Sequence, residues 1–172
     1  MASFEYKMNI DMQGLYWLYG IAKELGKYHI KIGVLSGSKM NRNDGKTNAE
    51  IGMKHEFGSR SERIPRRSFL VDPLTVWHAD KIIQFLKDKH EDIIMKALFD
   101  FRFKGFDKPI KRIYTKLGMF CKQIIDDAFA SNGFGQWLPL SKYTIKKKGH
   151  SRILIETEQL RRSITFRTDK GS

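Results

Sequence analysis

The sequence lacks most of the features that would assign it to a specialised class of protein. Its single cysteine, Cys121, can form neither an intramolecular disulfide nor a cysteine-based zinc site. No apolar run approaches the roughly 18 residues needed to cross a bilayer, which predicts no membrane span. The first ten residues carry Glu5 and Lys7 where an export signal needs an uninterrupted apolar core. We therefore expect a chain that stays in the cytosol after synthesis and depends on its hydrophobic core for stability.

Complete catalytic motifs are also missing. Residues 44–47 (DGKT) resemble the end of a phosphate-binding P-loop, but Met40 occupies the place of the required first glycine. His55 precedes a glutamate as in zinc proteases, yet Ser59 stands where the second histidine would be. We expect no enzymatic activity, no cofactor and no metal site, and we assign no catalytic residue.

The length and composition favour one globular domain. The chain has 172 residues, of which 41% are hydrophobic and 30% are charged. These fractions lie within the range of globular proteins and outside that of disordered ones. A chain of this length buries roughly 70% of its unfolded surface around one core. We expect residues 1–172 to form a single domain.

What the sequence has in excess is positive charge. Thirty-two Lys and Arg against 19 Asp and Glu give a net charge of +13 and a pI near 9.8. The basic C-terminal segment, residues 141–172, has nine Lys and Arg against three acidic residues. A second concentration is the arginine cluster, which consists of Arg60, Arg63, Arg66 and Arg67. Such an excess favours polyanionic partners such as nucleic acid, although dispersed lysines that keep a protein soluble explain it equally well.

Hydrophobic spacing predicts the elements of the first part of the chain. Alternation over residues 4–8 and again over 28–34 predicts two strands. Between them, apolar residues three and four apart predict a helix over 12–25, capped by Asp11. Residues 36–47 are polar and rich in Gly, Ser and Asn, which predicts a long exposed loop.

Capping signals predict the helices of the middle of the chain. Asn48 can cap a short helix that runs through Glu56. Asp72 followed by Pro73 is a strong helix start, because proline at the first helical position loses no hydrogen bond. Helical spacing then continues to residue 101, with a break before Asp80.

The last part of the chain completes a mixed pattern. Pro109 starts a second long helix, and Ser141 caps a short basic helix that ends at Gly149. Thr157 can cap a further turn, and alternation over 164–166 indicates a closing strand. We expect an α+β fold in which a small mixed or antiparallel sheet packs against two long helices.

Two segments carry a resemblance to a known family. Asn48–Gly58 (NAEIGMKHEFG), followed by Ile64–Leu70 (IPRRSFL), resembles the central signature of the tailed-phage tail-completion and neck proteins, the virion-morphogenesis families. Trp137–Ser141 (WLPLS) with Leu154–Ile164 (LIETEQLRRSI) resembles their C-terminal signature. The motif residues to which the resemblance gives structural roles are His55, Glu56, Phe57, Gly58, Pro65, Phe69, Trp137, Pro139, Leu140, Ser141, Thr157, Leu160 and Ser163.

The sequence departs from the family pattern at three positions. Glu158 stands where glycine is expected, Glu156 where aspartate is usual, and Ser68 where proline is frequent. A glutamate at position 158 is compatible with the first turn of a helix capped by Thr157, where the helix dipole favours negative charge.

The resemblance implies a structural protein of the virion rather than an enzyme. Its implied partners are copies of itself in a homo-oligomeric ring, a hexamer, together with the neighbouring head-connector and tail-terminator ring proteins and the genomic double-stranded DNA in the lumen. The ring would lie at the head–tail junction, after assembly in the cytoplasm of the bacterial host. A tail terminator and a free, non-specific nucleic-acid-binding protein are the alternatives.

Individual motif residues have a physical interpretation as well. Large aromatic residues beside tight turns usually anchor loops in a core, which predicts that Phe57 and Trp137 are buried. Arginines as dense as the cluster are hard to bury and repel one another, which favours an acidic protein surface or DNA phosphate as partner over a merely solvated loop. The residues expected to contact a partner or DNA are Arg60, Arg63, Arg66, Arg67, Arg161 and Arg162.

Overall fold

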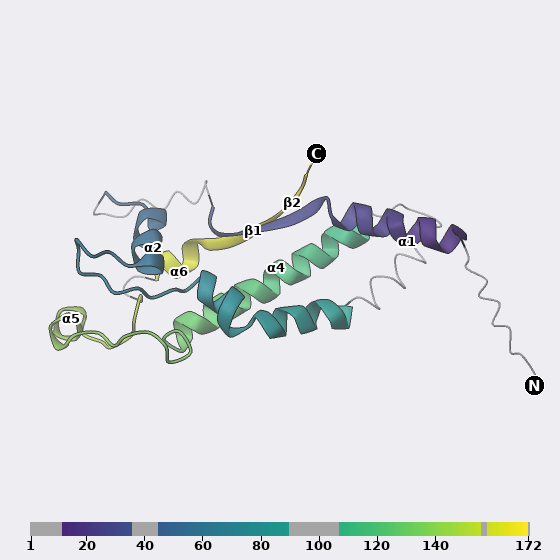
Figure 1. Cartoon of the computed structure of the whole chain (residues 1–172). Helices are drawn as coiled ribbons and strands as arrows, with labels where there is room; N and C mark the ends of the chain where they lie inside the picture. The colour runs from purple at the N-terminus through teal and green to yellow at the C-terminus, as the bar shows by residue number, and fades with distance from the viewer. Residues whose placement is uncertain (1–11, 36–44, 90–106, 156–157, 172) are drawn as a thin grey trace, which may run out of the picture.

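The computed structural model describes residues 12–35, 45–89, 107–155 and 158–171. It has an α+β fold, in which helix α4 (Asp107–Ala130) runs along an antiparallel pair of strands, β1 (Tyr28–Val34) and β2 (Ile164–Lys170) (Figure 1). Helix α1 (Met12–Leu25) lies at one end of this arrangement. The short helices α2 (Asn48–Phe57), α5 (Lys142–Lys148) and α6 (Gln159–Ser163) gather at the other.

The sheet joins segments from the two ends of the described chain. Tyr28 lies opposite Lys170 and Val34 opposite Ile164, in a continuous antiparallel register. The two strands therefore confirm the predictions over 28–34 and at 164–166, and they make the sheet antiparallel. The strand predicted over 4–8 lies outside the described residues.

The hydrophobic core lies where α4 meets the short helices and the sheet. Its buried members are Phe69, Ile125, Ala128, Phe129, Trp137, Ile153, Ile155, Leu160 and Ile164. Most of these residues belong to the two signature segments or to the C-terminal half of α4. The core therefore holds the two signature segments together on one end of α4.

The long helix predicted after Asp72 is interrupted. Residues 71 and 72 are helical, Pro73–Trp77 form the π-helical turn η1, and helix resumes at residues 79–89 after His78 leaves the helical conformation. The sequence predicts a break before Asp80, and the observed break at His78 confirms it within two residues. Among the described residues α4 alone forms a long continuous helix; residues 90–101 of the other predicted helix lie outside them.

The helix start predicted at Asp72 and Pro73 is confirmed within one residue, whereas the predicted cap of α2 is wrong. Asp72 is itself helical and makes no side-chain cap hydrogen bond, because the chain already turns into the helix at residue 71. Asn48 is the first residue of α2 rather than its cap. Thr47 caps this helix instead, since its side chain accepts from the Glu50 amide while the Glu50 side chain accepts from the Thr47 amide.

The caps of α5 agree with prediction, and those of α6 differ. The Ser141 side chain accepts a hydrogen bond from the Thr144 amide, and Gly149 ends α5 in a left-handed conformation. Thr157 lies outside the described residues, and the residue before α6 that takes the cap position is Glu158. Of the loop predicted over 36–47, residues 45–47 are described and are exposed. No described helix is both long enough and apolar enough to cross a membrane.

Candidate functional site

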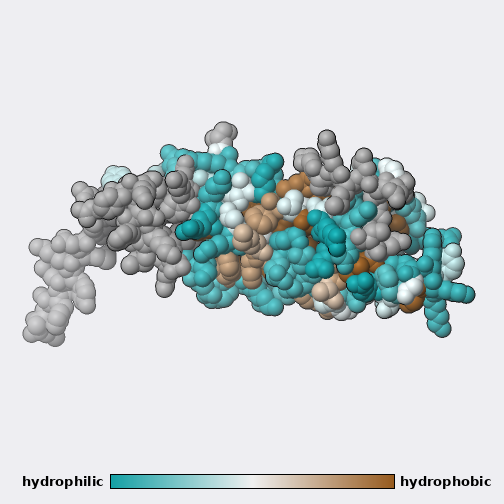
Figure 2. Space-filling model, turned by 180° about the vertical axis from the view of Figure 1, so that it is seen from behind, coloured by the Kyte–Doolittle hydropathy of each residue, from teal (hydrophilic) through white to brown (hydrophobic). Residues whose placement is uncertain are grey.

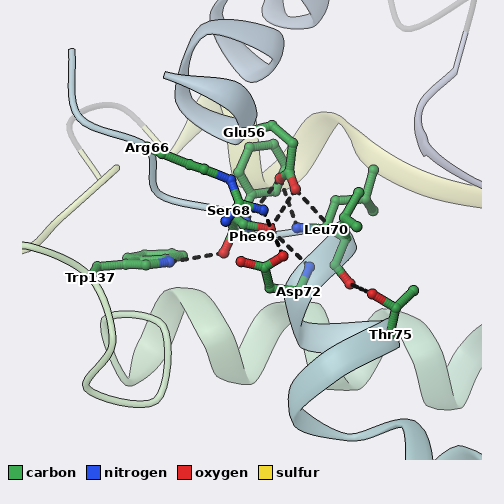
Figure 3. Close-up of polar contacts among 9 residues, drawn as sticks. Glu56, Arg66, Ser68, Phe69, Leu70, Asp72, Thr75 and Trp137 are labelled. Carbon is green, nitrogen blue, oxygen red and sulfur yellow. Dashed lines mark hydrogen bonds and ion pairs between the residues drawn. The ribbon is translucent and has the colours of Figure 1, made fainter. Parts of the chain in front are cut away.

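The buried carboxylate of Glu56 connects the end of α2 to the chain that follows the arginine cluster. One oxygen, Oε2, accepts hydrogen bonds from the amides of Phe69 at 2.9 Å and Leu70 at 3.0 Å. The other, Oε1, accepts from the Val71 amide at 3.0 Å and from the Ser68 hydroxyl. These amides lie at the start of the helical region, so Glu56 caps this region from α2. Figure 3 shows the carboxylate at the centre of these contacts.

Ser68 completes this cap from the other side. While its hydroxyl donates to Glu56, the same oxygen accepts a hydrogen bond of 2.8 Å from the Asp72 amide. The side chain is 2% exposed. A proline at this position, as the family pattern frequently has, could make neither contact. The departure at Ser68 is therefore matched by hydrogen bonds that the hydroxyl alone supplies.

Trp137 joins the C-terminal signature to the central one. It is 5% exposed, as predicted for a loop anchor, and its indole Nε1 donates to the Ser68 carbonyl at 2.9 Å. Gly133, which has a φ of +69°, lies directly under the indole: a Cβ there would come within 2.3 Å of Nε1. The turn after α4 therefore needs glycine both for its backbone conformation and for the space that Trp137 occupies.

Arg67 is a structural residue and not the partner contact that we expected. Its side chain is buried, and Nε and Nη2 donate to the Leu138 carbonyl at 3.1 and 3.0 Å. Burial lowers the pKa of the guanidinium. The expectation failed because backbone carbonyls of the WLPLS segment satisfy the charged donors, which makes burial tolerable without a carboxylate.

The other three members of the arginine cluster also differ from one another. Arg66 forms an ion pair with Asp72, with Nη2 and Oδ1 2.6 Å apart, and this bond raises the pKa of the guanidinium. Arg60 and Arg63 are exposed, and their side chains make no hydrogen bond or ion pair with any described residue. The cluster thus contains one buried arginine, one exposed arginine that is paired within the chain, and two exposed arginines without an ionic partner among the described residues.

Arg60 and Arg63 stand on a tight hairpin. Ser59 and Ile64 pair through two backbone hydrogen bonds of 2.9 and 2.8 Å, and the Arg63 amide donates to the Arg60 carbonyl. Gly58 leads into this hairpin with a φ of +78°, and a Cβ there would lie 3.1 Å from the Arg66 amide nitrogen. The hairpin therefore explains the glycine of the HEFG motif, and it holds the two arginines on a defined backbone.

Phe57 is exposed, against expectation. Its side chain is 65% exposed, and Met53, one turn earlier on α2, is 64% exposed. The two lie four residues apart and so share a face of the helix. Glu56 takes the buried direction at this end of α2, which turns its neighbour Phe57 outward. The i, i+4 spacing of Met53 and Phe57 in the sequence already indicates that the two side chains share one face of the helix.

A groove lies between the hairpin and the C-terminal signature. It has a volume of about 560 Å³, and its walls include Arg63, Ile64 and Pro65 on one side and Leu140, Thr144 and Lys148 on the other. His55, half-buried, also lines it, and its backbone carbonyl accepts from the Arg67 amide at 2.7 Å. The motif residues around the groove thus have mixed apolar and basic character.

The remaining motif residues of the C-terminal signature support the local fold. Leu160 and Ser163 are buried, and the Ser163 hydroxyl donates to the Leu160 carbonyl at 2.7 Å. Pro139 is exposed and Leu140 is half-buried. From the central signature, Phe69 lies in the core against Phe129.

Arg161 and Arg162 are held by this chain. Arg161 Nε lies 3.1 Å from an oxygen of Asp126, which also binds Lys122, and Arg162 Nη2 lies 3.0 Å from Glu158 Oε2. Arg162 remains largely exposed, so a partner can still reach it. The structure does not place either arginine with Arg60 and Arg63 in a single site.

Glu158 has a left-handed backbone, with φ of 58° and ψ of 2°. Glycine adopts this conformation without strain, whereas other residues incur a cost of about 1 to 2 kcal/mol. The structure therefore supplies a reason for the glycine that the family pattern has at this position. The expectation that Glu158 belongs to the first helical turn is wrong, since α6 begins one residue later.

Within the described ranges no three His, Cys, Asp or Glu side chains lie where they could hold a metal ion. Cys121 is half-buried, and burial raises the pKa of its thiol. Searches against protein-family models, curated proteins and solved structures found no match to this chain.

Proposed function

We propose that this protein is a non-enzymatic structural component of a tailed phage, a tail-completion or neck protein. In this role it forms a homo-oligomeric ring, a hexamer, at the head–tail junction and joins tail to head around the DNA path. The proposal includes the fold that the resemblance implies, a small sheet against two long helices. Tail terminator is the alternative within the same class.

The observation that carries the proposal is the mutual contact of the two signature segments. Trp137 donates to the carbonyl of Ser68, and Arg67 donates to the carbonyl of Leu138, so each segment supplies a side chain that bonds to the backbone of the other. These contacts bridge 69 and 71 residues of sequence. A chance resemblance in two separate stretches gives no reason for the matched residues to meet. Their meeting supports the view that the two stretches form one structural unit.

A second support comes from Glu158. The family pattern has glycine where this chain has a residue with left-handed backbone geometry. The backbone conformation at position 158 is a structural property, independent of the sequence pattern that carries the resemblance.

Removal of the gene tests the proposal. A phage that lacks this protein should produce DNA-filled heads and complete tails that remain separate, and expression of the protein from a plasmid should restore joined particles. Counting heads, tails and joined particles by electron microscopy gives the result. Normal yields of joined particles without the protein would overturn the proposal.

One observation favours free nucleic-acid binding as a second candidate. Helix α5 ends in Lys146, Lys147 and Lys148, and the first two are exposed. If this helix binds DNA phosphates in the isolated protein, affinity for a short duplex should fall steeply with salt concentration, and Lys146→Gln with Lys147→Gln should reduce the slope by about two. A ring component that needs its partners should bind the duplex weakly, and the salt dependence of its affinity should be the same in this variant as in the wild type.

A further inference from the structure

We infer that the exposed end of α2 and the adjoining hairpin form a docking surface for an acidic segment of a different protein. This α2–hairpin surface consists of Met53, Phe57, Arg60 and Arg63. The inference rests on the proposed function, since it names the kind of partner that the phage component binds there.

The four side chains belong to one continuous surface. Phe57, Arg60 and Arg63 line the same shallow depression, of about 390 Å³, at the junction of α2 and the hairpin. Met53 adjoins Phe57 on the exposed face of α2. Figure 2, which views the opposite side from Figure 1, shows hydrophobic residues as scattered patches among hydrophilic ones rather than as one broad apolar surface.

The composition of this surface favours protein over DNA. Aromatic residues, Met and Arg are the types enriched at the centres of protein interfaces. Phosphate binding calls for cations and polar donors, and gives no role to Phe57 and Met53, which are 65% and 64% exposed. An apolar side chain of a partner can cover both of them while its carboxylates meet the guanidinium groups.

Charge complementarity identifies an acidic partner. Arg60 and Arg63 have no carboxylate partner among the described residues, and Lys54 beside them is already paired with Glu62. Two desolvated guanidinium groups without carboxylates would oppose docking, so the partner must bring acidic side chains. The hairpin backbone, with its paired Ser59 and Ile64, holds the arginines ready for such contacts.

A second copy of this chain is a poor source of those acidic groups. Most carboxylates in the described ranges are already engaged within the chain: Glu24, Glu50, Glu56, Glu62, Asp72, Asp126, Glu158 and Asp169. Asp80, Asp88 and Asp127 have neither a cationic partner nor a backbone amide partner among the residues whose side chains the structure describes. The available carboxylates therefore favour a different, acidic protein.

Site-specific photocrosslinking tests the inference. Phe57 is replaced by benzoylphenylalanine in the phage-encoded protein, infected cells are irradiated, and the crosslinked peptide is sequenced by mass spectrometry from both cells and purified particles. We expect a product with one other phage protein, in a segment with an excess of Asp and Glu. The same photoreactive residue at Val76, which is 68% exposed, is the positional control and should not give this product.

Charge variants show whether the arginines direct the contact. Arg60→Glu with Arg63→Glu should reduce the yield of the product about tenfold, whereas Lys111→Glu with Arg112→Glu, which changes the net charge equally at two exposed sites on α4, should leave it within about twofold. The double variant Arg60→Gln with Arg63→Gln removes the two charges without reversing them and should reduce the yield less. Circular dichroism verifies that each variant folds. Exchange of the partner's mapped acidic residues to Lys should restore the product with the Arg→Glu pair.

The outcomes separate this inference from the proposed function. A crosslink to a second copy of the chain, a crosslink to DNA, or no product from Phe57 in particles that contain the chain would overturn the inference and leave the proposed function standing. Absence of the chain from particles would overturn the proposed function. In that case the product from irradiated cells still decides whether the surface binds an acidic protein.

Discussion

The indole Nε1 of Trp137 donates a hydrogen bond to the backbone carbonyl of Ser68, which lies 69 residues earlier in the chain. Ser68 in turn donates its hydroxyl to the buried carboxylate of Glu56. A continuous chain of hydrogen bonds therefore runs from the C-terminal signature through the central one to α2 (Figure 3). Its effects on stability can be measured residue by residue.

Glu56→Gln should destabilise the fold by about 2 to 4 kcal/mol, because the amide NH₂ would face backbone N–H donors that the carboxylate oxygens now satisfy. Urea unfolding followed by circular dichroism measures the change. Glu62→Gln is the matched control, since Glu62 makes an exposed ion pair with Lys54, and it should leave the midpoint nearly unchanged. Equal effects of the two substitutions would contradict the central role of Glu56.

The arginine cluster should separate into structural and exposed members. Arg67→Gln should cost about 1 to 3 kcal/mol, because the Leu138 carbonyl would lose its two charged donors inside the fold. Arg60→Gln and Arg63→Gln should leave thermal stability unchanged, since their side chains have no described partner. Equal melting temperatures of all three variants and the wild type would contradict the hydrogen bonds of Arg67 to the Leu138 carbonyl.

Glu158→Gly should raise the free energy of unfolding by about 0.5 to 1 kcal/mol, because relief of left-handed strain exceeds the extra entropy of glycine in the unfolded chain. Lys146→Gly, at an ordinary exposed position of α5, should instead destabilise by about 1 kcal/mol. Denaturant unfolding of both variants gives the comparison. Loss of stability in Glu158→Gly as large as in the control would argue against the left-handed conformation.

Cys121 should react slowly in the folded protein. It is half-buried, and burial raises the pKa of the thiol, so less thiolate is present at pH 8 than in the unfolded chain. Alkylation with iodoacetamide should be slower in buffer than in guanidinium chloride at the same pH, as followed by mass spectrometry. Equal rates under the two conditions would show that the thiol is freely accessible.

Local patterns in the sequence predicted most elements. The spacing over 12–25 and the alternation over 28–34 correspond to α1 and β1, and Ser141 and Gly149 bound α5 as expected. These features depend on residues a few positions apart. The register of β1 with β2 was not predictable in this way, because it joins Tyr28 to Lys170 across the whole described chain.

Errors occurred where a distant partner decides the outcome. The helix start at Asp72 and Pro73 follows a local signal, yet Glu56 supplies its cap from α2, and no local spacing encodes that contact. Arg67, which we expected to be exposed, is buried, and Phe57, which we expected to be buried, is exposed. Both differences have the same reason. The carbonyls that allow Arg67 to be buried come from a segment 71 residues away, and the burial of Glu56 directs Phe57 outward.

The central claim is that this chain is part of the head–tail junction. A cryo-EM map of the junction in intact particles tests it most directly, because α4 beside the β1–β2 pair gives a recognisable shape. We expect density for this fold in a ring between the head connector and the tail tube, with the α2–hairpin surface against a different protein. Particles whose junction rings are all occupied by other chains, with no copy of this fold among them, would contradict it.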